Sequence, residues 1–221
     1  EEGETNFDLD STSISESDYF KVFQLEDQVI LAFFNKPDNS IVMYDFNTKE
    51  LIRKVFLKTS GPDALFSIDS APSNFYIKNS DSIFVYSAVQ NHLYLISSQA
   101  KIKDKWYITS MREDQKYPAF RINSLNPIHF VNGKSTIIGS ISWFEDGVPP
   151  ILTIDLINDH KSFEPKEMPL YDQWDLLRIG SSDFFQPYST VFNQNRILVS
   201  YPKDCRVVDY SENEIKILSL P

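Results

Sequence analysis

The sequence is poor in the residues on which several kinds of functional site depend. Its single cysteine, Cys205, excludes an intramolecular disulfide and a thiolate metal cluster. With only six glycines, it has no glycine-rich loop of the kind that cradles phosphate groups. The longest apolar run, Val29–Phe34, is far too short to cross a bilayer. We therefore expect no transmembrane segment in this chain, and we expect Cys205 to pack in a strand as a small apolar residue.

Basic residues are also scarce relative to acidic ones. The chain has 21 lysines and arginines against 31 aspartates and glutamates, which gives a net charge of -10 at pH 7. Nucleic-acid binding needs a basic stripe that displaces counterions from the phosphate backbone, and no such stripe is visible. The sequence therefore predicts no nucleic-acid partner.

Short β-rich segments make up most of the chain. With 221 residues, 42% hydrophobic and 14% aromatic, it is long enough to bury a core, and we expect one domain over residues 1–221. Runs with strand-like alternation are separated by clusters of Asn, Asp, Ser and Pro. They form four groups of four runs, at residues 19–57, 74–108, 127–168 and 188–220.

One hairpin sequence occurs twice. The stretch YDFNTKELIRKVFL (Tyr44–Leu57) is echoed by VDYSENEIKILSL (Val208–Leu220), which begins 164 residues later. Three intervals then give about 55 residues per unit, near the ~40–50-residue period of propeller blades. We expect Asp45, Asp155 and Asp209 to end the third strands and to accept hydrogen bonds from turn N–H groups. The sequence thus predicts an all-β fold, a β-propeller of four-stranded antiparallel blades, four of them detectable.

The first half of the chain resembles a known family. The segments FDLDSTSIS, NSIVMYDFNTKELIRKVFL followed by GPDAL, and FYIKNSDSIFVYSAVQNHLYLISSQAKIKDKW are similar to uncharacterised bacterial β-propellers that are classed as a domain of unknown function. The second half resembles them only in its pattern. The resemblance implies a six- or seven-bladed ring, a location in the cell envelope, periplasmic or at the surface, and a lipid anchor outside this chain. That family offers no agreed catalytic residues to transfer.

The sequence allows two ways in which the propeller ring closes. The segment Thr5–Asp10 has the pattern of a strand, of the kind that completes the last blade, yet the fourth group already has an outer strand at residues 214–220. An incomplete ring is the favoured interpretation, and a closed four-bladed propeller is the alternative. The chain begins at Glu1 without a methionine, which would fit a removed export signal.

The connections between the expected strands differ sharply in length on the two faces of the blades. One face has tight turns, and the other has long loops, which are more often functional. The richest long loop is Pro169–Pro187, where flat apolar rings and a guanidinium would suit a protein, a peptide or a glycan. Its candidate binding residues are Tyr171, Trp174, Arg178, Phe184 and Phe185. The alternative is that Trp174 and Leu177 fix a short helix onto the rim.

No catalytic motif is present, and no cofactor or metal site is predicted. The expected strand positions of His92, His129 and His160 keep the three histidines from sharing one metal ion. We therefore expect a non-enzymatic binding or scaffold module with an unknown partner. The alternative is a propeller-type glycan hydrolase or lyase, whose acidic residues Asp63, Asp146 and Asp172 would converge at the channel mouth.

Overall fold

The fold was analysed in a computed structural model of the chain. The residues that the structure describes are 6–13, 17, 19–65, 74–87, 89–90, 92–107, 111–112, 115–116, 122, 127–131, 134–138, 151–155, 163–166, 188–192, 196–201, 204–211 and 215–219. The chain divides into two compact units, residues 1–106 and residues 107–221. The single domain expected over residues 1–221 stays a prediction.

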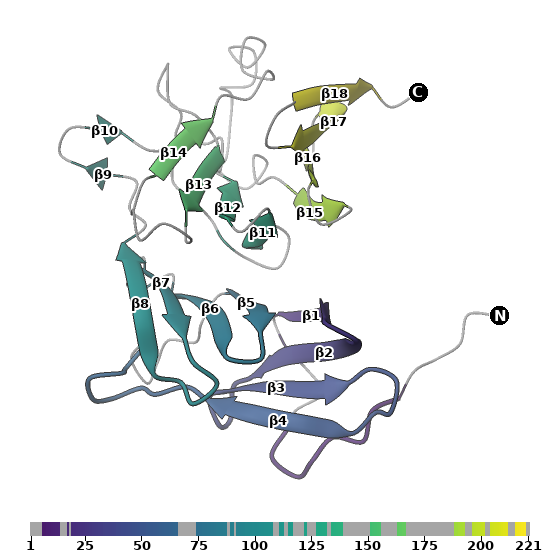
Figure 1. The fold of residues 1–221 in the computed structure, drawn as a ribbon, viewed down its shortest axis with the longest axis vertical. Coiled ribbons are helices and arrows are strands. Elements are labelled where there is room, and N and C mark those ends of the chain that lie inside the picture. The colour runs from purple at the N-terminus through teal and green to yellow at the C-terminus, as the bar shows by residue number, and fades with distance from the viewer. Residues whose placement is uncertain are drawn as a thin grey trace. The chain divides into compact units, whose positions relative to one another are not determined.

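The first unit consists of two four-stranded antiparallel sheets, in each of which the strands follow chain order. The first sheet, here called the first blade, is β1 (Phe20–Leu25), β2 (Gln28–Asn35), β3 (Ser40–Asp45) and β4 (Leu51–Phe56). The second blade is β5 (Asn74–Asn79), β6 (Ser82–Ser87), β7 (His92–Ile96) and β8 (Ile102–Tyr107). Figure 1 shows both as meanders, and the first strands β1 and β5 contact each other.

The turn between β3 and β4 has the chemistry expected for the repeated hairpin. The side-chain Oδ1 of Asp45 accepts hydrogen bonds from the backbone N–H groups of Asn47 and Thr48, both at 2.8 Å. Lys49 then takes a positive φ of 66° and returns the chain into β4. Because the carboxylate satisfies two turn donors, the prediction for Asp45 is confirmed.

A continuous apolar core fills the space between the two blades. It contains one face of β2 and β3, including Ile30, Ala32 and Met43, together with residues of the second blade such as Phe75 and Ile83. Aromatic rings connect the two blades across this space, since the ring centroids of Tyr19, just before β1, and Phe75 of β5 lie 4.9 Å apart at nearly right angles. The alternate positions of β6 are buried as well. Both faces of this strand are thus covered, as blades in a propeller require.

The second unit repeats the arrangement with two more four-stranded sheets. The third blade is β11 (His129–Val131), β12 (Lys134–Ile138), β13 (Ile151–Asp155) and β14 (Phe163–Lys166). The fourth blade is β15 (Tyr188–Phe192), β16 (Arg196–Tyr201), β17 (Asp204–Ser211) and β18 (Ile215–Ser219). A two-stranded ladder, β9 (Met111–Arg112) with β10 (Gln115–Lys116), precedes them. This small ladder lies in a segment expected to be a loop.

Two details of the sequence interpretation are wrong. Residues 6–10 are not a strand, because Phe7 and Asp10 anchor this segment to the first blade through side chains instead of a backbone ladder. Asp209 does not end its strand, since β17 continues to Ser211 and Asp209 pairs with Leu198 inside the ladder.

Candidate functional site

The first blade has two ends that differ in their connections. At one end lie the tight turns 26–27 and 46–50. At the other end lie the 36–39 loop and the start of the connection that follows β4. This second end is the long-loop end that the sequence favours for function. Its described polar residues are therefore candidates for a functional site.

Lys54 is the centre of a partly buried polar cluster at the long-loop end. Its side chain is only 8% exposed, and its Nζ lies 2.8 Å from an Asp10 oxygen and 3.2 Å from Asp38 Oδ2. It also donates to Thr12 Oγ1 at 2.7 Å. An ammonium group has three N–H donors, so these three acceptor residues occupy Lys54 completely. Asp10 and Thr12 belong to the segment before β1, which Lys54 therefore ties to the blade.

Asp38 extends this cluster into the loop between β2 and β3. Its Oδ1 accepts hydrogen bonds from Asn35 Nδ2 and from Ser40 Oγ, both at 2.6 Å. Although burial raises the pKa of Asp38, the bonds from Ser40, Asn35 and Lys54 outweigh burial and lower the pKa overall. The hydrogen bond from Lys54 likewise lowers the pKa of Asp10. Both carboxylates are ionised at neutral pH, which suits an ion-paired clamp and not an acid that donates protons.

Asp63, the one described member of the alternative acidic site, lies in the connection that follows β4. Its Oδ2 is 2.8 Å from Lys58 Nζ, and its Oδ1 accepts the backbone N–H of Ile102 at 3.2 Å. The bond from Lys58 holds the pKa of Asp63 below its usual range. Since Ile102 begins β8, the outermost strand of the second blade, Asp63 is held at the outer strand and not beside β1 and β5. Between Lys58 and Asp63 the chain turns at Gly61, whose positive φ of 85° suits glycine.

Two further polar groups lie on first strands. Lys21 of β1 places its Nζ 5.2 Å from the ring centroid of Tyr76 and 5.5 Å from that of Phe23, and burial lowers the pKa of Lys21 to about 8. In the second unit, His129 of β11 is buried and its Nε2 lies 2.7 Å from Ser189 Oγ of β15. The expected position of His129 on a first strand is confirmed. Both contacts link neighbouring blades through their first strands.

The remaining residues singled out from the sequence lie outside the described residues. They are the binding candidates Tyr171, Trp174, Arg178, Phe184 and Phe185, and the acidic candidates Asp146 and Asp172. The binding and acidic sites therefore stay predictions. Within the described part of the chain, no three His, Cys, Asp or Glu side chains are grouped to hold a metal ion.

The sequence interpretation missed Lys54 and Arg53, which follow each other in β4. No local pattern reveals their partners, because Asp10 lies 44 residues before Lys54 and Ser80 lies 27 residues after Arg53. The segment DST at residues 10–12 is the one sequence pattern that could have indicated the contact between Asp10 and Lys54, because its composition is typical of a turn. There Asp10 Oδ1 accepts the backbone N–H of Thr12 at 3.1 Å, a local turn that is incompatible with continued strand pairing.

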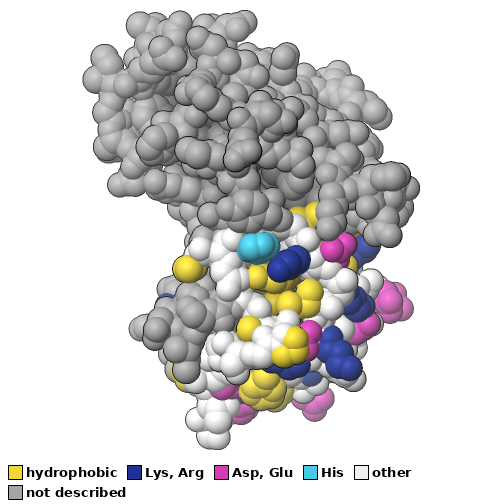
Figure 2. Space-filling model, turned by 90° about the vertical axis from the view of Figure 1, so that its left-hand side faces the viewer, with side chains coloured by type: hydrophobic (Ala, Val, Ile, Leu, Met, Phe, Trp, Pro, Cys, Tyr) yellow, Lys and Arg dark blue, Asp and Glu magenta, His cyan; other side chains and the backbone are white. Residues whose placement is uncertain are grey.

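The surface of the described residues carries both signs of charge. In the view of Figure 2, basic and acidic side chains alternate over the described part without a continuous basic area. No helix among the described residues has the length and apolar character needed to traverse a bilayer.

Comparison with known proteins places this fold in a family. The family described as a domain of unknown function, DUF4221, matches residues 1–220. The chain belongs to the DUF4221 family. A crystal structure of a DUF4221 member from Bacteroides vulgatus superposes with a TM-score of 0.69 at 16% identity, covering 96% of this chain and 60% of that one. This DUF4221 chain thus spans about three fifths of the length of that relative.

More distant structures share the fold of this DUF4221 chain. A streptogramin B lyase matches with a TM-score of 0.50 at 10% identity, over 95% of this chain and 58% of that chain. Virginiamycin B lyase from Staphylococcus aureus matches with a TM-score of 0.50 at 11% identity, over 91% and 55%. At these identities the likeness shows a β-propeller fold alone. No curated protein matches the sequence significantly.

Proposed function

We propose that this DUF4221 protein is a non-enzymatic binding or scaffold module of the bacterial cell envelope. Its partner is a protein, a peptide or a glycan, recognised at the long-loop end of the blades. The observation that supports this role is the Lys54 cluster, in which Asp10, Thr12 and Asp38 immobilise the loop before β3 and the segment before β1. Loops held in this way form a preorganised surface, and preorganisation lowers the entropic cost of binding.

Three described carboxylates, those of Asp10, Asp38 and Asp63, are engaged in structural contacts. Asp10 and Asp38 bond to Lys54, and Asp63 bonds to Lys58 and to the backbone of β8. A general acid needs a pKa near the working pH, whereas the pKa values of these three groups are lowered. These observations favour a binder over the alternative glycan hydrolase or lyase. The likeness to the two lyases named above concerns the fold alone, so it does not favour an enzymatic function.

A panel of defined probes separates the two functions. The purified chain is titrated by calorimetry with peptidoglycan fragments, other oligosaccharides of defined sequence, and short peptides, and each mixture is then analysed for cleaved products. The proposal expects saturable binding of one probe class without product. Turnover of any glycan would contradict it, and so would the failure of every class to bind.

The envelope location is tested separately in the bacterium that carries the gene. We expect the full-length protein to fractionate with the envelope and to incorporate a labelled fatty acid if the anchor lies outside these 221 residues. Recovery of the intact protein only in the cytoplasmic fraction would refute this part of the proposal.

A further inference from the structure

A pocket opens at the tight-turn end of the first unit, opposite the end discussed above. It has a volume of about 250 Å³ and lies between the first blade and the second. Its walls come from the turn between β1 and β2, from β4, and from the turn between β5 and β6. This volume is below the roughly 300–1,000 Å³ of sites for drug-sized ligands, so the pocket suits a group of about one amino-acid residue.

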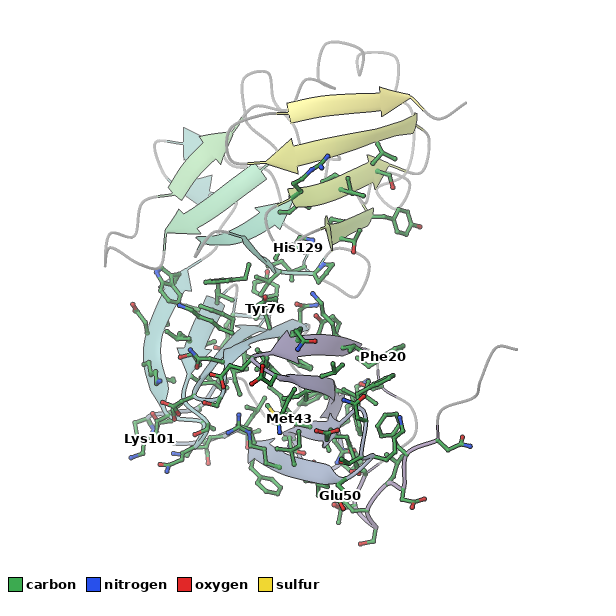
Figure 3. All side chains as sticks on the ribbon, turned by 45° about the vertical axis from the view of Figure 1, so that its right-hand side comes forward. Phe20, Met43, Glu50, Tyr76, Lys101 and His129 are labelled. Carbon is green, nitrogen blue, oxygen red and sulfur yellow. The ribbon has the colours of Figure 1, made fainter. Side chains whose placement is uncertain are left out.

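The floor of the pocket is apolar and fixed. Ile30 of β2 and Met43 of β3 line it, and both are buried in the core between the blades. In Figure 3, Met43 lies inside the first unit among the side chains of this core. Ile52 of β4 adds an apolar wall that is 40% exposed. An apolar group of a ligand would therefore leave water without any rearrangement of the floor.

Arg53 supplies the directional polar group of the pocket. Its Nη2 donates to the Ser80 carbonyl oxygen of the second blade at 2.6 Å, and its Nε approaches the Met43 sulfur at 3.4 Å. A guanidinium has five N–H donors, so three of them have no partner among the described residues. The two contacts hold the planar group in place, which preorganises the remaining donors for an acceptor in the pocket.

The charges around the pocket favour an anion. Among the described residues that line it, Arg53 and Lys78 carry positive charges and Glu26 carries the one carboxylate, in a chain whose net charge is -10. The turn that carries Glu26 is set by its positive φ of 51° and by the hydrogen bond from Gln24 Nε2 to the Glu26 carbonyl oxygen at 2.9 Å. A local excess of positive charge in an acidic protein attracts a small anion to this place.

We propose that this pocket binds a carboxylate carried on a small apolar group, with Arg53 bonding the carboxylate and Met43 and Ile30 contacting the apolar part. A guanidinium matches the geometry of a carboxylate, and the apolar floor disfavours a fully hydrated anion such as phosphate. The C-terminal residue of a peptide and a free apolar acid have this same chemistry. The site lies at the other end of the blades from the proposed recognition surface and does not depend on it.

The methionine methyl groups report directly on this pocket. The chain has three methionines, so a methyl-labelled sample gives few signals, and Met43→Leu assigns the one from the pocket floor. The probes are N-acetyl-leucine, its amide, inorganic phosphate, and a tripeptide ending in leucine with a free or an amidated C-terminus. We expect N-acetyl-leucine to shift the Met43 signal saturably, and the amide to bind about tenfold more weakly or less.

Two variants and one control complete the test. Arg53→Gln removes the guanidinium, and Ile52→Asp places a negative charge on an exposed wall where the fold tolerates it; each should weaken acid binding by about tenfold or more. Lys105→Gln removes an exposed cation of β8 and should leave binding unchanged. A free-ended tripeptide that binds more tightly than N-acetyl-leucine assigns the site to peptide C-termini, and equal affinity assigns it to small acids.

The proposal is overturned by any of three results. The first is that N-acetyl-leucine and its amide bind equally, and the second is that phosphate binds as well as N-acetyl-leucine. The third is that the folded Arg53→Gln and Ile52→Asp variants both bind N-acetyl-leucine within about twofold of the parent. A change of about twofold is well below the effect of a lost charged hydrogen bond. If Arg53→Gln does not fold, Ile52→Asp alone decides, because its side chain lies outside the core.

Discussion

Arg53 and Lys54 are neighbours in β4, yet they serve opposite faces of the first blade in different ways. Lys54 is almost completely buried, and Asp10, Thr12 and Asp38 engage all three of its N–H donors. Arg53 keeps three of its five donors without a described partner, at the edge of a pocket. Successive side chains of a strand point to opposite faces, so one strand holds both a structural cation and an available one.

Structural and functional charged groups differ in how much of their hydrogen-bonding capacity their own chain uses. A charged group whose hydrogen-bonding capacity is filled by its own chain contributes to the fold. A group that is fixed in place but only partly used is a candidate for binding. By this criterion the described residues favour the tight-turn end for a ligand pocket, and the long-loop end for a rigid surface.

The largest expected effect comes from the apolar core between the first and second blades. Ile83 is fully buried between the blades, so Ile83→Ala should lower the free energy of unfolding by roughly 2–5 kcal/mol. Val89→Ala is the control, because Val89 is exposed. The measurement is urea denaturation followed by fluorescence. An unchanged midpoint for Ile83→Ala would contradict the packing of the core that contains Met43, which the Arg53 guanidinium contacts.

Removal of the Asp38 carboxylate from the Lys54 cluster should lower the free energy of unfolding by a smaller amount. Asp38→Ala leaves Lys54, Ser40 and one Asn35 bond without their acceptor, which should cost about 1–3 kcal/mol in unfolding free energy. Asp27→Ala, in an exposed turn at the other end, is the matched control. If both variants unfold at the same urea concentration, the cluster does not stabilise the blade.

Acid should weaken the Lys54 cluster specifically. The pKa of Asp38 is lowered in the folded chain, while an unfolded aspartate titrates near ~3.9. Its stabilising contribution is therefore present above about pH 5 and is lost as the pH falls below about 4, because the unfolded state then binds more protons. Asp38→Asn should flatten this part of the pH dependence of the melting temperature. An identical acid dependence in Asp38→Asn would show that other groups are responsible.

The order and type of the strands could be predicted from the sequence, because alternation and turn chemistry are local. The run VILAFFN lies within β2, and the Asp45 turn forms as its composition indicates. Residues 6–10 also show a strand pattern, but Phe7 packs on Tyr44 with 5.8 Å between ring centroids, and Asp10 reaches Lys54. Such tertiary contacts override local propensity.

The polar cluster and the pocket could not be predicted from the sequence. Each combines residues that are far apart in the chain, and no spacing rule connects Arg53 with Ser80 or Lys54 with Asp10. Long loops and aromatic rings are visible in the sequence, and they favour residues 169–187 as the site instead. That preference has a physical basis, but it ignores how many donors of a charged group remain available.

The smallest effect on stability is expected in the recognition loop predicted from the sequence. Trp174→Ala should weaken binding of the probe found above by more than about 1 kcal/mol while leaving the melting temperature nearly unchanged. Phe56→Ala, which removes an exposed ring of β4, is the control. If Trp174→Ala unfolds the protein, the indole fixes the loop to the rim and the binding interpretation of residues 169–187 is wrong.

The most direct test of the contrast between the two neighbours is the unfolding free energy of Arg53→Gln and Lys54→Gln, measured side by side in urea at pH 7. Both variants remove one positive charge from the same strand. We expect Lys54→Gln to lose about 2 kcal/mol or more, because two carboxylates lose their partner, and Arg53→Gln to lose less than about 1 kcal/mol. An equal or larger loss in Arg53→Gln would show that Arg53 is a structural residue, and the distinction between the two ends of the blade would then be wrong.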